Sequence, residues 1–195
     1  MPTPTDPQPL TIPTMPTRSG RFVLRPFTLD DAPDVHQAMS DPRIAATTTV
    51  AYPYPDGAAE SWIATHTSSA AAGTELVWAI TTPDDDRAIG TISIGLTPKH
   101  RRAELGYWLA VPWWGQGVMS DAARTVVAYG FETLGLHRIQ ARCLPENIGS
   151  AKVMQHAGMT FEGILRDYEF HKGAFVNLAM YAIVAGREGE PGSQR

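Results

Sequence analysis

The chain has 195 residues, of which 43% are hydrophobic and 18% are charged, and its formal net charge at pH 7 is −4. This length and apolar content predict one globular domain with a sizeable core, and the negative charge argues against a nucleic-acid-binding protein. The only cysteine, Cys143, excludes an internal disulfide bond and fits a reducing compartment. No apolar run reaches the ~18 residues that a membrane-spanning helix needs, and no signal-peptide pattern is found. We therefore expect a cytoplasmic protein.

Two polar segments flank the predicted domain. Residues 1–17 are rich in Pro and Thr and offer little to bury, which predicts a flexible or loosely docked tail. Residues 186–195 are polar and contain Gly, which predicts a second tail. A single domain over residues 18–185 is expected between them.

The first part of this domain predicts a strand and two helices. Residues 21–27 alternate apolar and polar side chains, as a strand does. A helix should begin at the capping residue Thr28 and end before Asp41-Pro42. Residues 45–55 are too irregular for an element, and residues 58–71 predict a second helix.

Three apolar segments separated by polar turns predict an antiparallel meander. They cover residues 76–81, 88–96 and 103–110. The basic turn at residues 99–102 has the composition of a solvated hairpin tip, although such a turn can also attract acidic ligands.

The last part of the chain predicts two helices and three strands. The helices cover residues 122–134 and about 147–157, and Gly158 suits the left-handed position after the second one. The strands are expected at residues 138–144, 160–169 and 175–184.

A glycine-bearing turn joins the strand at residues 103–110 to the helix that follows, in the segment Val111-Pro112-Trp113-Trp114-Gly115-Gln116-Gly117-Val118. Such a turn directs several backbone N–H groups the same way, and the helix dipole adds positive charge, so the place suits a phosphate. A Walker loop requires Lys where Val118 stands, and the dinucleotide fingerprint requires a third glycine where Ser120 stands. A coenzyme A pyrophosphate loop is the third possibility. The alternative to all three is a plain strand–helix turn.

The segment Trp108-Leu109-Ala110-Val111-Pro112-Trp113-Trp114-Gly115-Gln116-Gly117-Val118-Met119-Ser120-Asp121-Ala122 resembles the acyl-CoA loop of the GNAT acetyltransferase superfamily. It is most similar to the RimJ/RimL branch, the ribosomal-protein N-terminal acetyltransferases and their relatives. The superfamily pattern is Q/R-x-x-G-x-G/A. Gly117 matches this pattern, whereas Trp114 and Met119 depart from it at the first and last positions.

The resemblance continues downstream and covers about residues 21–184. Asn147-Ile148-Gly149-Ser150 is similar to the N-x-x-S helix start of the branch, and residues 161–166 resemble its F-E-G-x-x-R strand. The resemblance implies a mixed α/β GNAT fold with a splayed, mostly antiparallel sheet. We expect six or seven strands and about four flanking helices.

The resemblance also implies a reaction. The expected enzyme moves an acetyl group from acetyl-CoA to a primary amine by direct attack within a ternary complex. The acceptor is expected to be a protein N-terminus or a small-molecule amine, and the chain to be a monomer or homodimer without nucleic-acid or membrane partners. Alternatives are another donor such as succinyl-CoA, a non-catalytic acyl-CoA-binding module and, more distantly, a nucleotide-binding protein.

Three residues are candidates for the chemistry. The spacing of Ser150 and Glu169 matches the acid–base pair proposed for RimL-like enzymes, which implies that Ser150 assists the leaving thiolate and Glu169 takes the amine proton. Glu104 lies on the central strand, at a position that carries the base in other GNAT enzymes. The alternatives are a structural carboxylate for Glu104, an exposed strand-end residue for Glu169 and a helix-terminus role for Ser150.

The resemblance implies acyl-CoA contacts from the end of the central strand, the glycine turn and the following helices. These contacts come from Leu109, Ala110, Val111, Trp114, Gly115, Gln116, Gly117, Val118, Met119, Asn147 and Lys152. Asn147 is equally suited to cap its helix, and Lys152 to lie in solvent.

The acceptor side is less distinct in the sequence. The aromatic residues that could wall a pocket are Tyr52, Tyr54, Trp62, Trp113, Trp114, Tyr168 and Phe170. Most aromatic residues belong to cores. The histidines His36, His137 and His156 lack metal-ligand spacing, so we predict no metal site.

Overall fold

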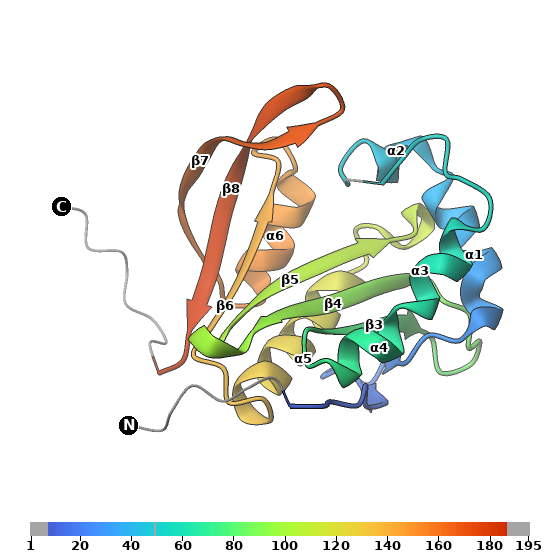
Figure 1. The fold of residues 1–195 in the computed structure, drawn as a ribbon, viewed down its shortest axis with the longest axis horizontal. Helices are drawn as coiled ribbons and strands as arrows, with labels where there is room; N and C mark the ends of the chain where they lie inside the picture. The colour runs from blue at the N-terminus through green and yellow to red at the C-terminus, as the bar shows by residue number, and fades with distance from the viewer. Residues whose placement is uncertain (1–7, 49, 187–195) are drawn as a thin grey trace.

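The structure is a computed structural model that describes residues 8–48 and 50–186. Eight strands in this part of the chain form one sheet in the order β1-β2-β3-β4-β5-β6-β8-β7 (Figure 1). Only the β5–β6 pair is parallel. The strands are β1 Met15–Pro16, β2 Val23–Arg25, β3 Glu75–Thr81, β4 Gly90–Thr97, β5 Arg102–Leu109, β6 Arg138–Cys143, β7 Thr160–His171 and β8 Ala174–Val184. The mostly antiparallel sheet and the meander of β3, β4 and β5 agree with the sequence-based prediction, which expected one or two strands fewer.

Strand β1 lies inside the segment predicted to be a flexible tail. It pairs antiparallel with β2, and the indole nitrogen of Trp78 donates a 2.9 Å hydrogen bond to the carbonyl oxygen of Pro13. Three apolar side chains of the segment also pack against the core: Leu10, Ile12 and Met15. Of the two expectations for this segment, a flexible or a loosely docked tail, residues 8–17 fit the docked one, because a few apolar side chains pack a segment of polar average composition against the core. Residues 1–7 and 187–195 lie outside the described residues.

Six α-helices occur in the described residues, against about four expected. They are α1 Ala32–Met39, α2 Pro42–Ala45, α3 Ala58–Ala64, α4 His66–Ala71, α5 Val118–Glu132 and α6 Ile148–His156. The predicted helix over residues 58–71 is divided at Thr65 into α3 and α4. The short α2 was not predicted. It forms directly after the expected helix stop at Asp41-Pro42, because Asp41 caps it by accepting a 2.9 Å hydrogen bond from the amide of Arg43.

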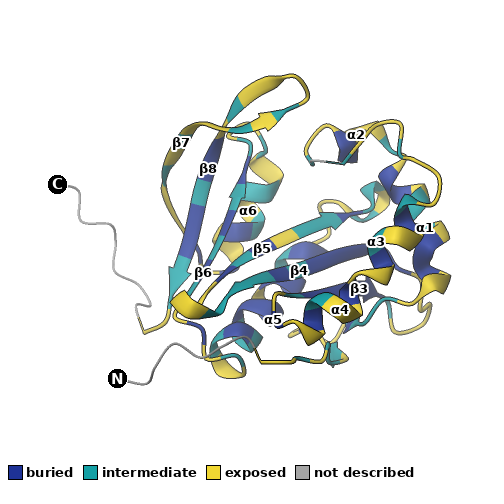
Figure 2. Ribbon diagram, in the orientation of Figure 1, coloured by how far each residue is buried: buried dark blue, intermediate teal, exposed yellow. Residues whose placement is uncertain are grey.

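The helices cover both faces of the sheet, and α5 lies behind the strands in Figure 1, with α3 and α4 in front. One apolar cluster joins the central strands to α5 and α6, and a second lies among α1, α2 and α3. Strand β3 is buried along nearly its whole length, whereas β7 is largely exposed (Figure 2). No helix in residues 8–48 and 50–186 combines the length and the apolar composition needed to cross a membrane.

The sheet splits between β5 and β6. Their register holds only from Arg102 to Glu104, opposite residues 138–140. Beyond that point β5 stays paired with β4 and β6 stays paired with β8, so the two strands diverge as a V (Figure 1). The β7–β8 hairpin and α2 lie on the two sides of the wide end of this V.

Candidate active site

The glycine turn follows β5 and lies between the one-turn 3-10 helix Val111–Trp113 and α5. Gly115 and Gly117 both have left-handed backbone angles, with φ of 73° and 78°, and nothing lies within 4 Å of the position that a Cβ would take on either. Only glycine adopts this conformation readily. Gly117 is the N-cap of α5, which therefore begins at Val118 and not at residue 122 as predicted.

This turn leaves amides available for a ligand. The first backbone hydrogen bond of α5 runs from the amide of Asp121 to the carbonyl of Gly117, at 3.0 Å. The amides of residues 118–120 therefore precede the intrahelical ladder, at the positive end of a 15-residue helix. The donor set and the open space above the glycines fit a phosphate.

Two side chains of the turn hold it in place. The indole nitrogen of Trp114 donates to the carbonyl of Leu109 at 2.7 Å, and the side-chain amide of Gln116 donates to the carbonyl of Pro112 at 2.8 Å. Trp114 thus closes the turn onto the end of β5, which gives a physical reason for a Trp where the superfamily pattern has Gln or Arg.

The start of α6 lies across the V from β5. Asn147 caps the helix, because its side-chain oxygen accepts a 3.0 Å hydrogen bond from the amide of Ser150. The Ser150 hydroxyl lies 2.7 Å from the hydroxyl of Tyr107 on β5. This contact makes Tyr107 a site residue that the sequence analysis missed. The available signal was its alternation with Ala103 and Leu105 on the face that packs against the main core.

Two groups beside Ser150 stay protonated. Burial raises the pKa of the Tyr107 hydroxyl and that of the Cys143 thiol above their ordinary values. Cys143 is the last residue of β6 and is buried. The protonated Tyr107 hydroxyl and the Ser150 hydroxyl share a hydrogen bond in which either oxygen can be the donor.

Glu104 is held by two donors from β6. The Nε of Arg142 lies 2.6 Å from one carboxylate oxygen, and the side-chain amide of Gln140 lies 3.1 Å from the other. The Arg142 guanidinium also lies 5.0 Å from the centre of the Tyr168 ring. With both oxygens engaged, Glu104 fits the structural carboxylate that was one of its two expected roles.

Glu169 lies half-buried on β7, opposite Val176 on β8. No ion pair of its carboxylate occurs in the part of the chain that the structure describes. The β7–β8 register shifts just before it, and the side-chain oxygen of Asn177 accepts a 2.9 Å hydrogen bond from the amide of Asp167 within this bulge. Asn177 therefore helps to hold the bulge that precedes Glu169.

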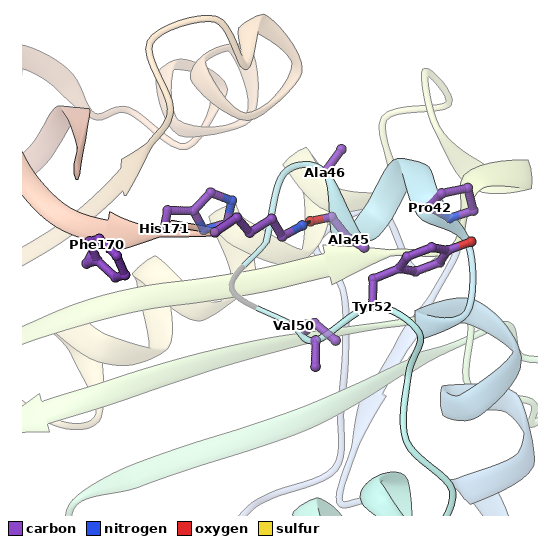
Figure 3. A pocket seen from close by; sticks show the side chains of 9 residues that line it. Pro42, Ala45, Ala46, Val50, Tyr52, Phe170 and His171 are labelled. Atoms are coloured by element: carbon purple, nitrogen blue, oxygen red, sulfur yellow. Dashed lines mark hydrogen bonds between the residues drawn. The ribbon is translucent and has the colours of Figure 1, made fainter. Parts of the chain in front are cut away.

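A cavity of about 730 Å³ lies between α2 with its following loop and the tip of the β7–β8 hairpin (Figure 3). Its lining consists of Pro42, Ala45, Ala46, Val50, Ala51, Tyr52, Phe170, His171 and Lys172. The ammonium group of Lys172 donates to the carbonyl oxygen of Ala45 and so joins the two walls.

Of the aromatic residues expected to wall a pocket, Tyr52 and Phe170 line this cavity. Trp62 packs edge-on against His66, and Trp113 against Phe22. Lys152 is exposed on α6. Among the described residues, no group of three or more His, Cys, Asp or Glu side chains is placed to hold a metal ion.

Comparisons with known proteins give a consistent result. A model of the acetyltransferase (GNAT) domain family matches residues 21–160. The uncharacterized N-acetyltransferase p20 of Bacillus licheniformis is 32% identical over 166 residues, which cover 84% of this chain and 93% of the relative. The ribosomal-protein-serine acetyltransferase of Escherichia coli (strain K12) is 32% identical over 101 residues, 51% of this chain and 56% of the relative. The structure of Mycobacterium smegmatis RimJ in complex with CoA-disulfide superposes with a TM-score of 0.77 at 27% identity, covering 91% of this chain and 88% of that one.

Proposed function

Since this chain belongs to the GNAT acetyltransferase family, we propose that it moves an acetyl group from acetyl-CoA to a primary amine bound between α2 and the β7–β8 hairpin. The chain is an acyl-CoA-dependent N-acetyltransferase. The observation that carries the finer proposal is the Ser150–Tyr107 hydroxyl pair, 2.7 Å apart across the V between β5 and β6. The glycine turn closes one end of β5, and the hairpin and α2 flank the wide end of the V.

The donor-binding part of the proposal rests on backbone groups. The amides of residues 118–120 bind the pyrophosphate. The backbone amides of Leu109, at the end of β5 that β6 leaves, and of Val111 just after it pair with the extended arm of the donor. Mycobacterium smegmatis RimJ, which shares the fold, was solved in complex with CoA-disulfide. Acetyl-CoA supplies an acetyl thioester, which is already activated for attack by an amine.

The chain's own residues handle the protons. An α-amine has a pKa of about 8 and is mostly protonated at neutral pH. The Glu169 carboxylate accepts its proton, directly or through water, and the neutral amine then attacks. The Ser150 hydroxyl hydrogen-bonds to the leaving sulfur. The surplus proton that attack leaves on the nitrogen passes to this sulfur, through the Ser150 hydroxyl or water, so that coenzyme A departs as a thiol. Tyr107, kept protonated by burial, shares a 2.7 Å hydrogen bond with the Ser150 hydroxyl.

We assign the base to Glu169 and not to Glu104. Arg142 and Gln140 already occupy both oxygens of Glu104. A carboxylate held by a cation has less tendency to accept a proton. Glu169 lies on the same face of β7 as His171, two residues further along the strand, and His171 lines the proposed acceptor cavity.

The test is thiol release from acetyl-CoA with a panel of amines, measured together with acetyl-CoA binding. Glu169→Gln should lower turnover by about 10²-fold, the usual contribution of a general base, and leave donor binding intact. Ser150→Ala and Tyr107→Phe should both lower turnover, and their double variant should lose little more than Ser150→Ala, because they act as one unit.

Glu104→Gln is the matched control, since it removes the same charge from a carboxylate of the same site. It should retain turnover. Loss of turnover in Glu104→Gln with normal activity of Glu169→Gln would reverse the assignment. Donor binding without thiol release for any amine would favour a non-catalytic acyl-CoA-binding module. Thiol release from succinyl-CoA but not from acetyl-CoA would identify succinyl-CoA as the acyl donor in place of acetyl-CoA.

The acceptor is proposed to be a protein N-terminus or a small-molecule amine. Relatives named as ribosomal-protein acetyltransferases support the first, but their matches cover about half of their own length. A cytoplasmic location and a monomeric or homodimeric state stay predictions.

A further inference from the structure

The acceptor cavity differs in chemistry from a site for polyamines or aminoglycosides. We infer that the acceptor is a primary amine whose only positive charge is the reacting ammonium group and whose body is apolar, preferably aromatic. This inference rests on the proposed function and narrows its substrate class. It depends on the walls of the cavity, on the charges that line it and on the position of the hairpin tip.

The walls are apolar. Tyr52 and Phe170 lie on different sides of the cavity, with Val50 between α2 and the hairpin (Figure 3). Both aromatic side chains are largely exposed, 55% for Tyr52 and 63% for Phe170. Exposed aromatic surface lining a concave site gains from covering by an apolar ligand group. The Phe170 ring packs edge-on against the ring of Phe175, with 5.2 Å between the ring centres.

The charges of the lining are unsuited to a second cation. The lining residues include Lys172 and His171 but no Asp or Glu. The nearby Asp41 is already paired with Arg43, at 2.7 Å. Glu169 remains for the reacting amine alone. A second ammonium group in this cavity would lose water without gaining a carboxylate, and Lys172 would repel it.

The contacts of Lys172 keep its ammonium group in the cavity lining, where it can repel a second cation. Its backbone is in the left-handed region at the hairpin tip, with φ of 48°, and its ammonium group donates to the carbonyl of Ala45, the last residue of α2. The ammonium group is therefore held against α2 in the lining of the cavity, while Lys172 as a whole is exposed to solvent.

The experiment compares acceptors of matched size by kcat/KM for thiol release. The apolar arm contains 2-phenylethylamine and the peptide Phe-Ala-Ala amide, and the polycationic arm contains spermidine and Lys-Ala-Ala amide. We expect the apolar arm to be preferred by on the order of 10²-fold, the range that a shaped apolar pocket supports. Relative rates within the apolar arm distinguish a small amine from a peptide N-terminus.

Variants connect this preference to the cavity. Phe170→Ala should raise KM for 2-phenylethylamine about tenfold and leave acetyl-CoA binding unchanged. Phe161→Ala is the matched control, because Phe161 is a similarly exposed residue, 53%, on the same strand but outside the lining. Ala46→Asp places a carboxylate in the exposed lining, and Lys172→Gln removes the cation while keeping a donor for Ala45. Each should raise kcat/KM for spermidine.

The outcomes separate the two levels of the proposal. Preference for spermidine or for Lys-Ala-Ala amide by the wild type would overturn the inference while leaving the acetyltransferase proposal intact. Equal effects of Phe170→Ala and Phe161→Ala would also overturn it, since the cavity would then not hold the acceptor. Acetyl-CoA binding without thiol release for any of the four amines would contradict the proposed function itself, and the inference with it.

Discussion

Single residues of the site have their roles set by partners that are distant in the sequence. Ser150 and Tyr107 are 43 positions apart, and Glu104 and Arg142 are 38 apart, yet each pair is in hydrogen-bond contact. Two glutamates that appeared equivalent in the sequence therefore differ in the structure: one is held by an arginine and the other is available. The physical cause is the strand order, which brings β6 beside β5 only at the closed end of the V.

His66 is a buried residue whose protonation should affect stability. It begins α4, and neither ring nitrogen has a hydrogen-bond partner among the described residues. Burial lowers its pKa from 6.5 to about 4. Between these pH values the unfolded chain binds a proton at His66 and the folded chain does not. The free energy of unfolding therefore falls as pH falls from about 6.5 to about 4.

We expect this residue to cost up to about 3 kcal/mol of unfolding free energy between pH 7 and pH 4, at ~1.4 kcal/mol per pKa unit. His66→Phe keeps a ring beside Trp62, 4.4 Å away in the wild type, and removes the titrating group. Urea unfolding at both pH values should therefore show a smaller loss for the variant. An equal loss in both proteins would assign the acid sensitivity to other groups.

At the scale of elements, the β7–β8 hairpin has to place Glu169, and a bulge does so. Two more residues of β7 than of β8 lie between the pairs Leu165–Leu178 and Glu169–Val176. Asp167, with φ of 48°, occupies the bulge and donates to Asn177. With Glu169 as the proposed base, we expect the side chain of Asn177 to influence catalysis through backbone geometry, without contact with the reacting atoms.

Asn177→Ala should lower kcat by about tenfold, because a residue that orients a reacting group through another residue typically contributes at least this much, and KM for acetyl-CoA should stay unchanged. Asn177→Asp keeps an oxygen acceptor for the Asp167 amide and should restore most of the activity. Steady-state kinetics and thermal unfolding of both variants provide the comparison. If Asn177→Asp were as impaired as Asn177→Ala, the hydrogen bond would not be the relevant feature.

For the whole molecule, the N-terminal segment ties the sheet edge to the helix that carries the glycine turn. The amide of Arg18 donates to the Thr125 hydroxyl at 3.0 Å, and the amide of Ser19 donates to the Asp121 carboxylate at 3.2 Å. Both acceptors lie in α5. The segment before them adds β1 and covers the core with its apolar side chains.

Deletion of residues 1–16 should therefore destabilise the protein by about 3–5 kcal/mol. It removes the apolar side chains of Leu10, Ile12 and Met15 from the core and leaves the indole nitrogen of Trp78 without the carbonyl of Pro13. At roughly 2–4 °C per kcal/mol, Tm should fall by about 10 °C. Deletion of residues 1–7 is the control, since it leaves every contact described above in place. Equal Tm values for the two deletions would show that the docked segment adds no stability.

The sequence alone was enough to predict which segments are helices or strands in most of the chain, and to predict the family. Apolar segments bounded by polar turns predicted the meander of β3, β4 and β5, and the last three strands were also expected. The resemblance to the GNAT superfamily is confirmed, and the cap at Asn147 follows from a local hydrogen bond. These features depend on neighbours within a few residues. The start of α5 was misplaced because the left-handed Gly117 cap has no periodic signal.

The hydrogen bonds between polar side chains of different elements could be identified only in the folded structure. The Tyr107–Ser150 pair, the engagement of Glu104 and the contact between Lys172 and Ala45, 127 positions apart, all follow from strand order and from the divergence of β5 and β6. No periodicity or spacing records such contacts, because they depend on how separate elements pack. The docking of residues 8–17 has the same cause, since a few apolar side chains gain their burial only when the core is already assembled.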